Sequence, residues 1–499
     1  MSGAMGLMHF LVPDRSRLAA DAAARAHMSG IDGVPWNCRV VATPAGLIID
    51  RPGSDSGNVH VPWQIEGRGE LLLSTASLME RARPYNLAVE LARGTLHRLR
   101  NQIAAWQNAG MELPESARTR LQEAMHHLGL AVTRQSNPAH AAEEAQKSIT
   151  TCVELIEFVT GQYVEQVADA RSRQGQKLPT LFGASLGDDL LDDKVCALVA
   201  STFNTAIVPF TWGQVESVEG QPDWSTTDRQ IAWCQSVGMR VCGGPLLQPD
   251  VLGLPQWMYL WEDDFANLLT FVSRYVRQVV LRYQGRVHLW HCAARTNTAT
   301  ALALTEEQKL RLTIRAVEAI REVDNRTPVI VSFDQPWAEH MFHHDRELSP
   351  LHFADAIVRA ELGVAGLGLE INYGYHPRGT LTRDLLAVSY QIDRWSLFSL
   401  PLVVLLTIPS SSQPDSQARE KAEPLSGMAV GGLSPESQRV EAERLIPLLL
   451  AKQPVQAVIW NQLCDFAPHS FPNGGLVDHR DQPKPAWEAL RSLRQRYLT

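Results

Sequence analysis

The stretch Phe203-Asn204-Thr205-Ala206-Ile207-Val208-Pro209 belongs to a series of short apolar runs that decides the fold of this 499-residue chain. Each run has the length of a buried strand, and patterns of helical period separate one run from the next. The predicted strands are residues 181–184, 205–209, 240–243, 287–290, 329–333, 366–371, 402–406 and 457–460. Strands that alternate with helices are typical of a parallel sheet, so this pattern predicts an α/β fold of the TIM (β/α)8 barrel type.

Two other patterns precede the predicted barrel. Residues 1–88 alternate short apolar or β-branched runs with turn residues, which predicts a small β-rich, sandwich-like module that could bind carbohydrate or a second copy of the chain. Residues 89–177 repeat apolar side chains at helical spacing, which predicts a helical connecting region. The barrel then occupies residues 178–499, and the sequence leaves open whether the chain forms a homo-oligomer.

Local signals mark some helix starts and one long connection. Thr305 followed by Gln308 is the pattern of a capping box, and Pro435 after Ser434 suits the first turn of a helix. Residues 409–433 are rich in Ser, Pro, Gly and charge, so we expect a mobile loop on the seventh strand-to-helix connection. In a TIM barrel such loops lie on the face where sites are built.

The composition limits the classes of function. With 45% hydrophobic and 20% charged residues, the chain can bury a core and is not of the disordered class. The net charge of −8 gives no basic footprint, so neither nucleic acid nor a membrane is expected as a partner. The first residues lack a signal-peptide pattern and the seven cysteines lack CxxC spacing, which predicts a cytoplasmic protein without a disulfide framework. No phosphate-binding or dinucleotide-binding loop occurs in the sequence, so no cofactor is predicted.

Three fragments carry a family resemblance. Residues 203–209 are similar to a pattern F-N-x-(V/I)-T-P, residues 285–290 to the lead-in of a pattern W-D-V-V-N-E, and residues 482–487 to the start of a final helix. These patterns are those of glycoside hydrolase family 10, the retaining β-1,4-xylanases, which residues 178–499 resemble in the order and spacing of the fragments. The resemblance implies a TIM barrel, a carbohydrate partner, and hydrolysis of a β-linked glycan by two carboxylates about 5–5.5 Å apart.

The same alignment places other side chains at the two catalytic positions. Arg295 falls where the resemblance implies the acid/base, and Leu406 falls where it implies the nucleophile. A guanidinium stays protonated and an alkyl group cannot attack a carbon atom, so neither residue can do the family's chemistry. Two functions therefore stay open. The first is a divergent hydrolase of a β-linked glycan or oligosaccharide, and the second is a catalytically inactive carbohydrate-binding or interaction protein.

Two acidic residues at strand ends could replace the missing catalytic pair. Asp334 ends the fifth predicted strand and Glu370 lies at the end of the sixth, and strand ends converge on one rim of a barrel. One carboxyl would then have a raised pKa and act as the acid. His291 could act as a base if one of the two acids oriented it. The alternative is that one of the acids forms a salt bridge with Arg295 and only restores a polar network.

Aromatic and polar side chains are predicted near the same rim. Aromatic faces stack on sugar rings while polar edges reach hydroxyls, so such a mixture indicates a carbohydrate groove. The predicted substrate-binding residues are Trp290, His291, Arg295, Trp337, Tyr373, Tyr375, His376, Trp460 and Asp465. His340, His343, His344 and Asp345 have the spacing of one helical face, but their polar surroundings favour a solvated loop, so no metal site is predicted.

Overall fold

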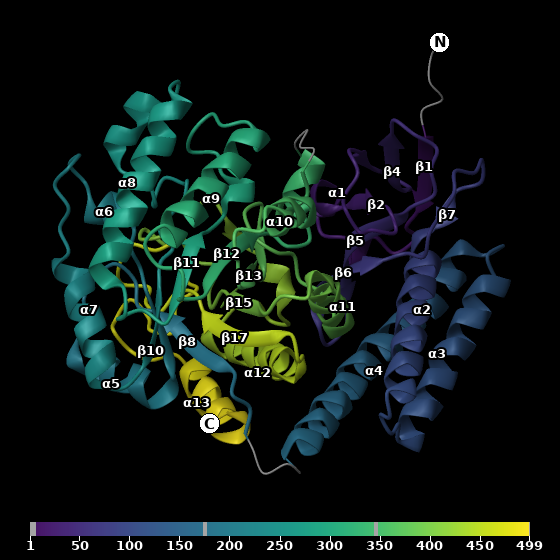
Figure 1. Ribbon diagram of the computed structural model, residues 1–499. Coiled ribbons are helices and arrows are strands. Elements are labelled where there is room, and N and C mark those ends of the chain that lie inside the picture. The colour runs from purple at the N-terminus through teal and green to yellow at the C-terminus, as the bar shows by residue number, and fades with distance from the viewer. Residues whose placement is uncertain (1–5, 173–176, 344–347, 499) are drawn as a thin grey trace.

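The computed structural model describes residues 6–172, 177–343 and 348–498. Within them, eight parallel strands close into a barrel (Figure 1). In the order in which they neighbour one another, the strands are β10 (Arg240–Gly243), β11 (Leu289–Ala293), β12 (Val329–Asp334), β13 (Gly366–Asn372), β15 (Leu402–Thr407), β17 (Val455–Trp460), β8 (Leu181–Ser185) and β9 (Thr205–Val208). The predicted (β/α)8 barrel is confirmed, and each strand overlaps one of the apolar runs that predict it.

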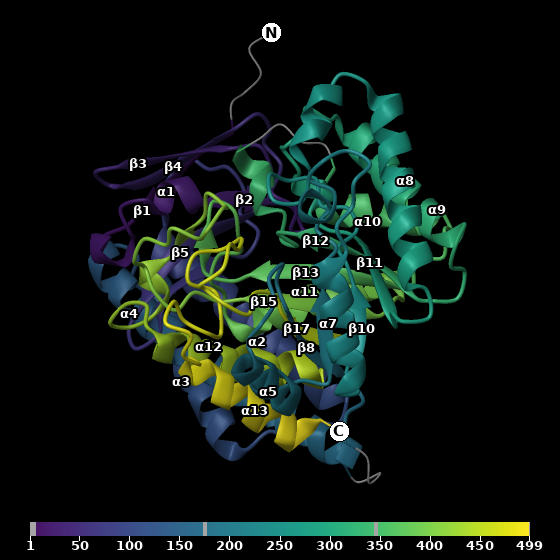
Figure 2. The same ribbon diagram turned by 90° about the vertical axis from the view of Figure 1, so that its left-hand side faces the viewer.

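Helices connect the strands and surround the barrel (Figure 2). They are α5 (Asp193–Thr202), α6 (Trp212–Val215), α7 (Ser225–Ser236), α8 (Phe265–Tyr283), α9 (Glu306–Arg321), α10 (Pro350–Arg359), α11 (Leu385–Trp395), α12 (Pro435–Ala451) and α13 (Pro485–Tyr497). Two helix starts are those that the sequence predicts. Thr305 and Gln308 form a capping box at α9, and Pro435 occupies the first turn of α12 behind Ser434.

The two faces of the barrel strands carry different side chains. Because side chains alternate along a strand, every second residue points into the barrel. The interior is filled by Ile207, Cys242, Ile330, Val403, Leu405, Ala457 and Ile459. Their neighbours Leu406 and Trp460 belong to a separate core, which lies between the strands and the helices. The face that a side chain occupies therefore decides whether it can reach a site at the strand ends.

The residues before the helical region form two small sheets. One contains β3 (Arg39–Thr43), β4 (Gly46–Arg51), β1 (Gly6–Leu11) and β7 (Tyr85–Asn86), and the other contains β2 (His27–Ser29), β5 (Asn58–Ile65) and β6 (Gly69–Ser74), with the short helix α1 (Ala22–Arg25) beside them. Met8, Ile49 and Val61 are among the side chains that form a common core between the sheets. The predicted β-rich, sandwich-like character is confirmed, while the boundaries of the three parts stay a prediction.

Three long helices join these sheets to the barrel. They are α2 (Leu87–Asn108), α3 (Glu115–Thr133) and α4 (Pro138–Ser172), and they lie beneath the sheets and beside the barrel (Figures 1 and 2). Their side chains enter both cores, since Leu91 packs with the sheets while Leu99 packs with the outer core of the barrel. No helix in the described ranges is long and apolar enough to cross a membrane.

The connection between β15 and α12 lies at the carboxyl ends of the barrel strands, as the sequence predicts. Its short strand β16 (Glu423–Pro424) pairs with β14 (Tyr375–His376) of another connection. The backbone N–H of Arg419 donates to the carbonyl of His469, which follows β17, at 3.0 Å. These hydrogen bonds tie down a segment for which the composition predicts mobility.

The β-rich sheets also touch this face of the barrel. The backbone N–H of Leu72 donates to the carbonyl of Thr382 at 2.7 Å, and the Thr382 hydroxyl donates to the carbonyl of Glu70 at 2.6 Å. Thr382 precedes α11, so the contact joins the module to the connection after β13. The module therefore supports the same end of the barrel that carries the long connections.

Candidate functional site

A cavity of about 160 Å³ lies at the carboxyl ends of the barrel strands. The residues at or just beyond strand ends that line it include Ser185, Ile207, His291, Glu370, Thr407 and Asn461. The loop after β8 adds Asp188 and Asp189, and the loop after β17 adds Phe466, Ser470 and Phe471. Sites for drug-sized ligands typically enclose about 300–1,000 Å³. This cavity therefore suits a small ligand or one end of a longer one.

Arg295 and Glu370 form a buried ion pair in the cavity wall. Arg295 Nε donates to Glu370 Oε2 at 2.7 Å, and the two side chains are 8% and 2% exposed. Arg295 Nη1 donates to Ser470 Oγ at 3.2 Å, and the guanidinium carbon lies 5.2 Å from the centre of the Phe471 ring. Burial alone would lower the pKa of Arg295, but the surrounding carboxylates, Glu370 foremost, more than offset this and raise it. The guanidinium is therefore charged and cannot donate a proton to a leaving group.

Glu370 is also held from the barrel interior. Ser332 Oγ donates to Glu370 Oε1 at 2.8 Å. Ser332 Oγ also lies 2.8 Å from His291 Nε2. Ser332 has a single hydroxyl proton, so His291 Nε2 is the donor in the second contact. Burial lowers the pKa of His291 to about 4, which makes the ring a poor proton acceptor at neutral pH. In this arrangement His291 helps to fix Glu370.

Asp334 lies beside Glu370 but does not reach the cavity. The two residues are directly opposite each other on β12 and β13. Thr298 Oγ1 donates to one Asp334 oxygen at 3.2 Å, and Asn372 Nδ2 donates to the other at 3.1 Å. Burial raises the pKa of Asp334 to about 7, with Arg295 opposing the rise and Glu370 adding to it. Glu370 belongs to the described residues that line the cavity, and Asp334 does not.

The comparisons with known proteins point to one family. The family model described as Glycosyl hydrolase family 10 matches residues 171–296, which include the first strands of the barrel. The barrel has a divergent, family 10-like fold. A comparison with curated proteins gives no match.

Solved xylanase structures are similar to this family 10-like chain at low identity. Xylanase 10B from Thermotoga maritima is 16% identical, with 64% of this chain and 95% of that chain covered and a TM-score of 0.48. Xylanase 10B from Thermotoga petrophila RKU-1, solved with xylobiose, is 15% identical, with 67% and 96% covered and a TM-score of 0.47. XynB from Paenibacillus barcinonensis is 16% identical, with 62% and 95% covered and a TM-score of 0.46. Likeness at such identity concerns the fold alone.

The family 10-like alignment needs a correction at the seventh strand. It predicts Leu406 at the attacking position, but the Leu406 side chain lies in the core outside the barrel. The next residue, Thr407, lines the cavity, and Leu405 before it fills the barrel interior. A shift of one residue moves a side chain to the opposite face of a strand. The rim position therefore carries a hydroxyl, which is still no carboxylate.

Two of the three tryptophans predicted to bind substrate, Trp290 and Trp460, pack away from the cavity. Trp290 and Trp460 belong to the core between strands and helices. The Trp290 indole N–H donates to Asp324 at 3.1 Å, and the Trp460 indole N–H donates to the carbonyl of Gly474 at 3.0 Å. Both rings are thus fully occupied by packing and by protein hydrogen bonds.

The other predicted aromatic residues are likewise placed outside the cavity lining. Tyr373 and Tyr375 are buried, and their hydroxyls donate to backbone carbonyls at 2.8 and 2.9 Å. The Trp337 ring lies 4.5 Å from the guanidinium carbon of Arg383. His376 is half-buried in β14. The structure brings together at the cavity Arg295, His291 and Glu370, but not these aromatic side chains.

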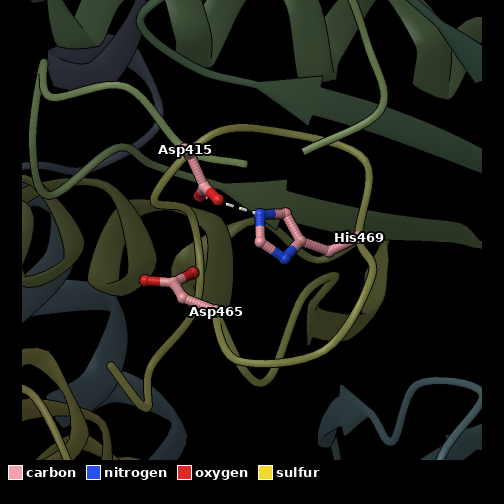
Figure 3. Close-up of side chains that lie close together, drawn as sticks. All are labelled: Asp415, Asp465 and His469. Carbon is pink, nitrogen blue, oxygen red and sulfur yellow. Dashed lines mark hydrogen bonds and ion pairs between the residues drawn. The ribbon is translucent and has the colours of Figure 1, made fainter. Parts of the chain in front are cut away.

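Asp465 belongs to a second charged cluster, of which His469 lines the cavity. Asp415, Asp465 and His469 have ligand atoms within 4.8 Å of one another (Figure 3). His469 Nε2 lies 2.9 Å from Asp415 Oδ2, while Asp465 forms an ion pair with the ammonium of Lys484. Lys484 also donates to Ser410 Oγ at 2.8 Å. Because an ammonium already neutralises Asp465, the cluster acts as a charge network that joins two loops.

The histidine-rich pattern at residues 340–345 cannot be placed as a group. Its members His344 and Asp345 lie outside the described residues, as does the side chain of His343. His340 belongs to a short 3-10 helix and is buried.

Several cavity residues were not predicted from the sequence. Asp188 and Asp189 lie in the loop that follows the first barrel strand, and acids at that place are a signal for a rim residue. Thr407 follows from the alternation of side chains once the register of β15 is known. Phe466 and Phe471 lie in an irregular loop, where no periodicity marks their direction.

Proposed function

We propose that this protein binds a carbohydrate, the end of a β-linked oligosaccharide, in the cavity at the carboxyl face of the barrel, and does not cleave it with a family 10 carboxylate pair. The observation that carries the proposal is the buried Arg295–Glu370 ion pair at 2.7 Å. It puts a permanent cation at the aligned acid/base position and commits the cavity's strand-end carboxylate to that cation.

The lining of the cavity supports a sugar as the ligand. Gln214, Gln248 and Asn461 present amide groups, which can donate and accept hydrogen bonds with hydroxyls. Phe466 and Phe471 add aromatic surface against which the apolar face of a sugar ring can pack. The match of residues 171–296 to a glycosyl hydrolase family also favours a glycan, and the small cavity favours its terminal ring.

Calorimetric titration with xylobiose and cellobiose tests the proposal, with release of reducing sugar measured on the same samples. We expect binding of at least one disaccharide and no release. Asn461→Ala should weaken binding because its amide lines the cavity, whereas the exposed Asn325→Ala is the matched control and should bind as the wild type does. Failure of every β-1,4-linked disaccharide tested, neutral or charged, to bind would overturn the proposal.

A second candidate function, hydrolysis, is favoured by one observation. Burial raises the pKa of Asp334 to about 7, directly opposite Glu370, and a protonated acid beside an ionised one is an arrangement that glycosidases use. If the wild type released reducing sugar and both Glu370→Gln and Asp334→Asn abolished the release, this candidate would replace the first. Release that persists in both variants would assign the activity to other residues.

A further inference from the structure

The charge of the cavity lining is unbalanced toward the acidic side. Among the described residues that line the cavity, Asp188, Asp189 and Glu370 carry carboxylates, and Arg295 is the one with a permanent positive charge. His469, which also lines the cavity, is already in contact with Asp415. An incoming ligand therefore meets more negative than positive charge.

The guanidinium of Arg295 is shared among several carboxylates. Besides Glu370 at 2.7 Å, Arg295 Nη1 lies 3.7 Å from Glu420 and 3.8 Å from Asp250. Arg378 approaches Glu420 at 3.8 Å, but its side chain is 36% exposed and solvent screens its charge. A ligand carboxylate would have to compete with these acids for Arg295. A ligand cation would instead complete the local charge balance.

A buried hydroxyl at the cavity is a second and independent sign of a polar ligand. Thr407 lines the cavity, is fully buried, and its Oγ1 has no hydrogen-bond partner among the described residues. A buried polar atom without a partner lowers stability, so a ligand or water that supplies the missing hydrogen bond at Thr407 would be stabilised. A hydroxyl oxygen accepts hydrogen bonds from an ammonium group as well as from a sugar hydroxyl.

The acidic loop is held in position by the protein. Gln230 Nε2 donates to the carbonyls of Gly187 at 2.9 Å and Asp189 at 3.0 Å. Thr211 Oγ1 donates to Asp188 Oδ1 at 2.6 Å. The loop that carries the two acids is therefore fixed in place before a ligand binds, which reduces the entropy lost on binding.

We infer that the cavity prefers a saccharide with a protonated amine, an amino sugar, to the neutral and the acidic sugars of the same linkage. This inference rests on the proposed carbohydrate-binding function and narrows its ligand class. The ammonium would lie near Asp188 and Asp189, and the remaining hydroxyls would contact the amide side chains and Thr407.

Four β-1,4-linked disaccharides test the inference by calorimetric titration. They are diglucosamine, its N-acetylated form, cellobiose and cellobiouronic acid, used at about pH 6, where an amine of ordinary pKa is protonated. We expect diglucosamine to bind at least about five-fold more tightly than cellobiose, and cellobiouronic acid to bind most weakly. Equal or tighter binding of cellobiose would overturn the preference while the proposed function stands. Binding of none of the four would overturn both.

A variant of Asp189 and its control test whether this carboxylate produces the preference for diglucosamine. Asp189→Asn should reduce the affinity for diglucosamine about three-fold and that for cellobiose by less, because the lost charge attracts only the protonated amine. Asp55→Asn changes an exposed aspartate of the β-rich module and should change neither affinity. Added salt should weaken diglucosamine binding more than cellobiose binding. An unchanged ratio of the two affinities in Asp189→Asn would contradict the assignment.

Discussion

Asp334, which lies beside Glu370 of the cavity wall, and Asp384, at the joint between helices and barrel, are both buried aspartates, yet their pKa values are shifted in opposite directions. Burial raises the pKa of each carboxyl, but at Asp384 the attraction of Arg98 and hydrogen bonds reverse the effect, so that its pKa is lowered. At Asp334 the opposing effect of Arg295 is insufficient, and the pKa rises to about 7.

The two regions differ in how many acids each guanidinium serves. At the joint, Arg98 Nη2 donates to Asp384 Oδ2 at 2.7 Å, and the Ala387 N–H donates to the other oxygen at 2.9 Å. At the cavity, the Arg295 guanidinium serves three carboxylates: Glu370 and two others that lie within 3.8 Å. A matched pair needs no further ion, whereas an unmatched cluster can gain a proton or a cationic ligand. The difference therefore separates a structural contact from a binding site.

Removal of the shared guanidinium should have the largest effect on stability. Arg295→Met leaves Glu370 and its neighbouring acids buried without their cation, so we expect the free energy of unfolding to fall by about 3–5 kcal/mol. Urea denaturation measures it. The matched variant Arg98→Met should lose less, because Arg98 serves one carboxylate and is 28% exposed. Equal losses at the two sites would remove the proposed distinction. The double variant Arg295→Met with Glu370→Gln should recover part of the loss.

The pH dependence of stability should reveal the unmatched acid. The pKa of Asp334 is about 7 in the folded protein and about 3.9 in an unfolded chain, so the folded state holds the extra proton between these values. Its free energy of unfolding then falls as pH rises through this window. Asp334→Asn removes that slope, and relative to wild type it should gain on the order of 2–4 kcal/mol between about pH 4 and about pH 7.

The control for this experiment is internal. The lowered pKa of His291 gives a slope of the opposite sign, but it is present in both proteins and cancels in the difference. A constant difference between variant and wild type across the window would show that Asp334 is ionised like an ordinary aspartate.

The barrel could be predicted from the sequence because each buried strand is a short apolar run between helical patterns. The family resemblance predicts Arg295 at the acid/base position. The salt bridge with Arg295, which the sequence leaves open as the alternative to a catalytic role, is present at Glu370. The face of Leu406 could not be predicted, since a register error of one residue is invisible in a run of apolar residues.

The placement of the aromatic side chains could not be predicted from the sequence for a related physical reason. Tryptophan is as suitable for filling the space between strands and helices as for stacking on sugar, and composition does not distinguish the two uses. Trp290 and Trp460 are adjacent to inward-facing positions on their strands, so their rings enter the outer core. The contribution of Asp250 and Glu420 to the cavity's charge depends on loops whose path the sequence does not specify.

Loss of the Asp384 charge should lower the free energy of unfolding less than loss of the Arg295 guanidinium does. Asp384→Asn keeps a residue that caps a helix well but removes the charge that faces Arg98, so we expect a loss of about 1–2 kcal/mol at neutral pH. Because its folded pKa is lowered, this contribution is present above the unfolded value of about 3.9 and disappears as pH falls through the folded pKa. Urea denaturation at several pH values checks it, and a loss that grows toward low pH would contradict the pairing. Asp384→Ala should lose about 1 kcal/mol more, because the cap is removed too.

The smallest expected effect on stability comes from two threonines, one in each region. The Thr407 hydroxyl at the cavity has no partner among the described residues, so Thr407→Val should leave the free energy of unfolding unchanged or raise it by less than about 1 kcal/mol. The Thr382 hydroxyl, two residues before Asp384, donates to the carbonyl of Glu70 in the β-rich module at 2.6 Å, so Thr382→Val should lower the free energy of unfolding by about 1 kcal/mol. Thermal melts of the two variants measure this contrast. If Thr407→Val also weakens sugar binding, the hydroxyl is kept for a ligand; if it lowers stability as Thr382→Val does, its partner is within the protein and the cavity loses one of its two signs of a ligand.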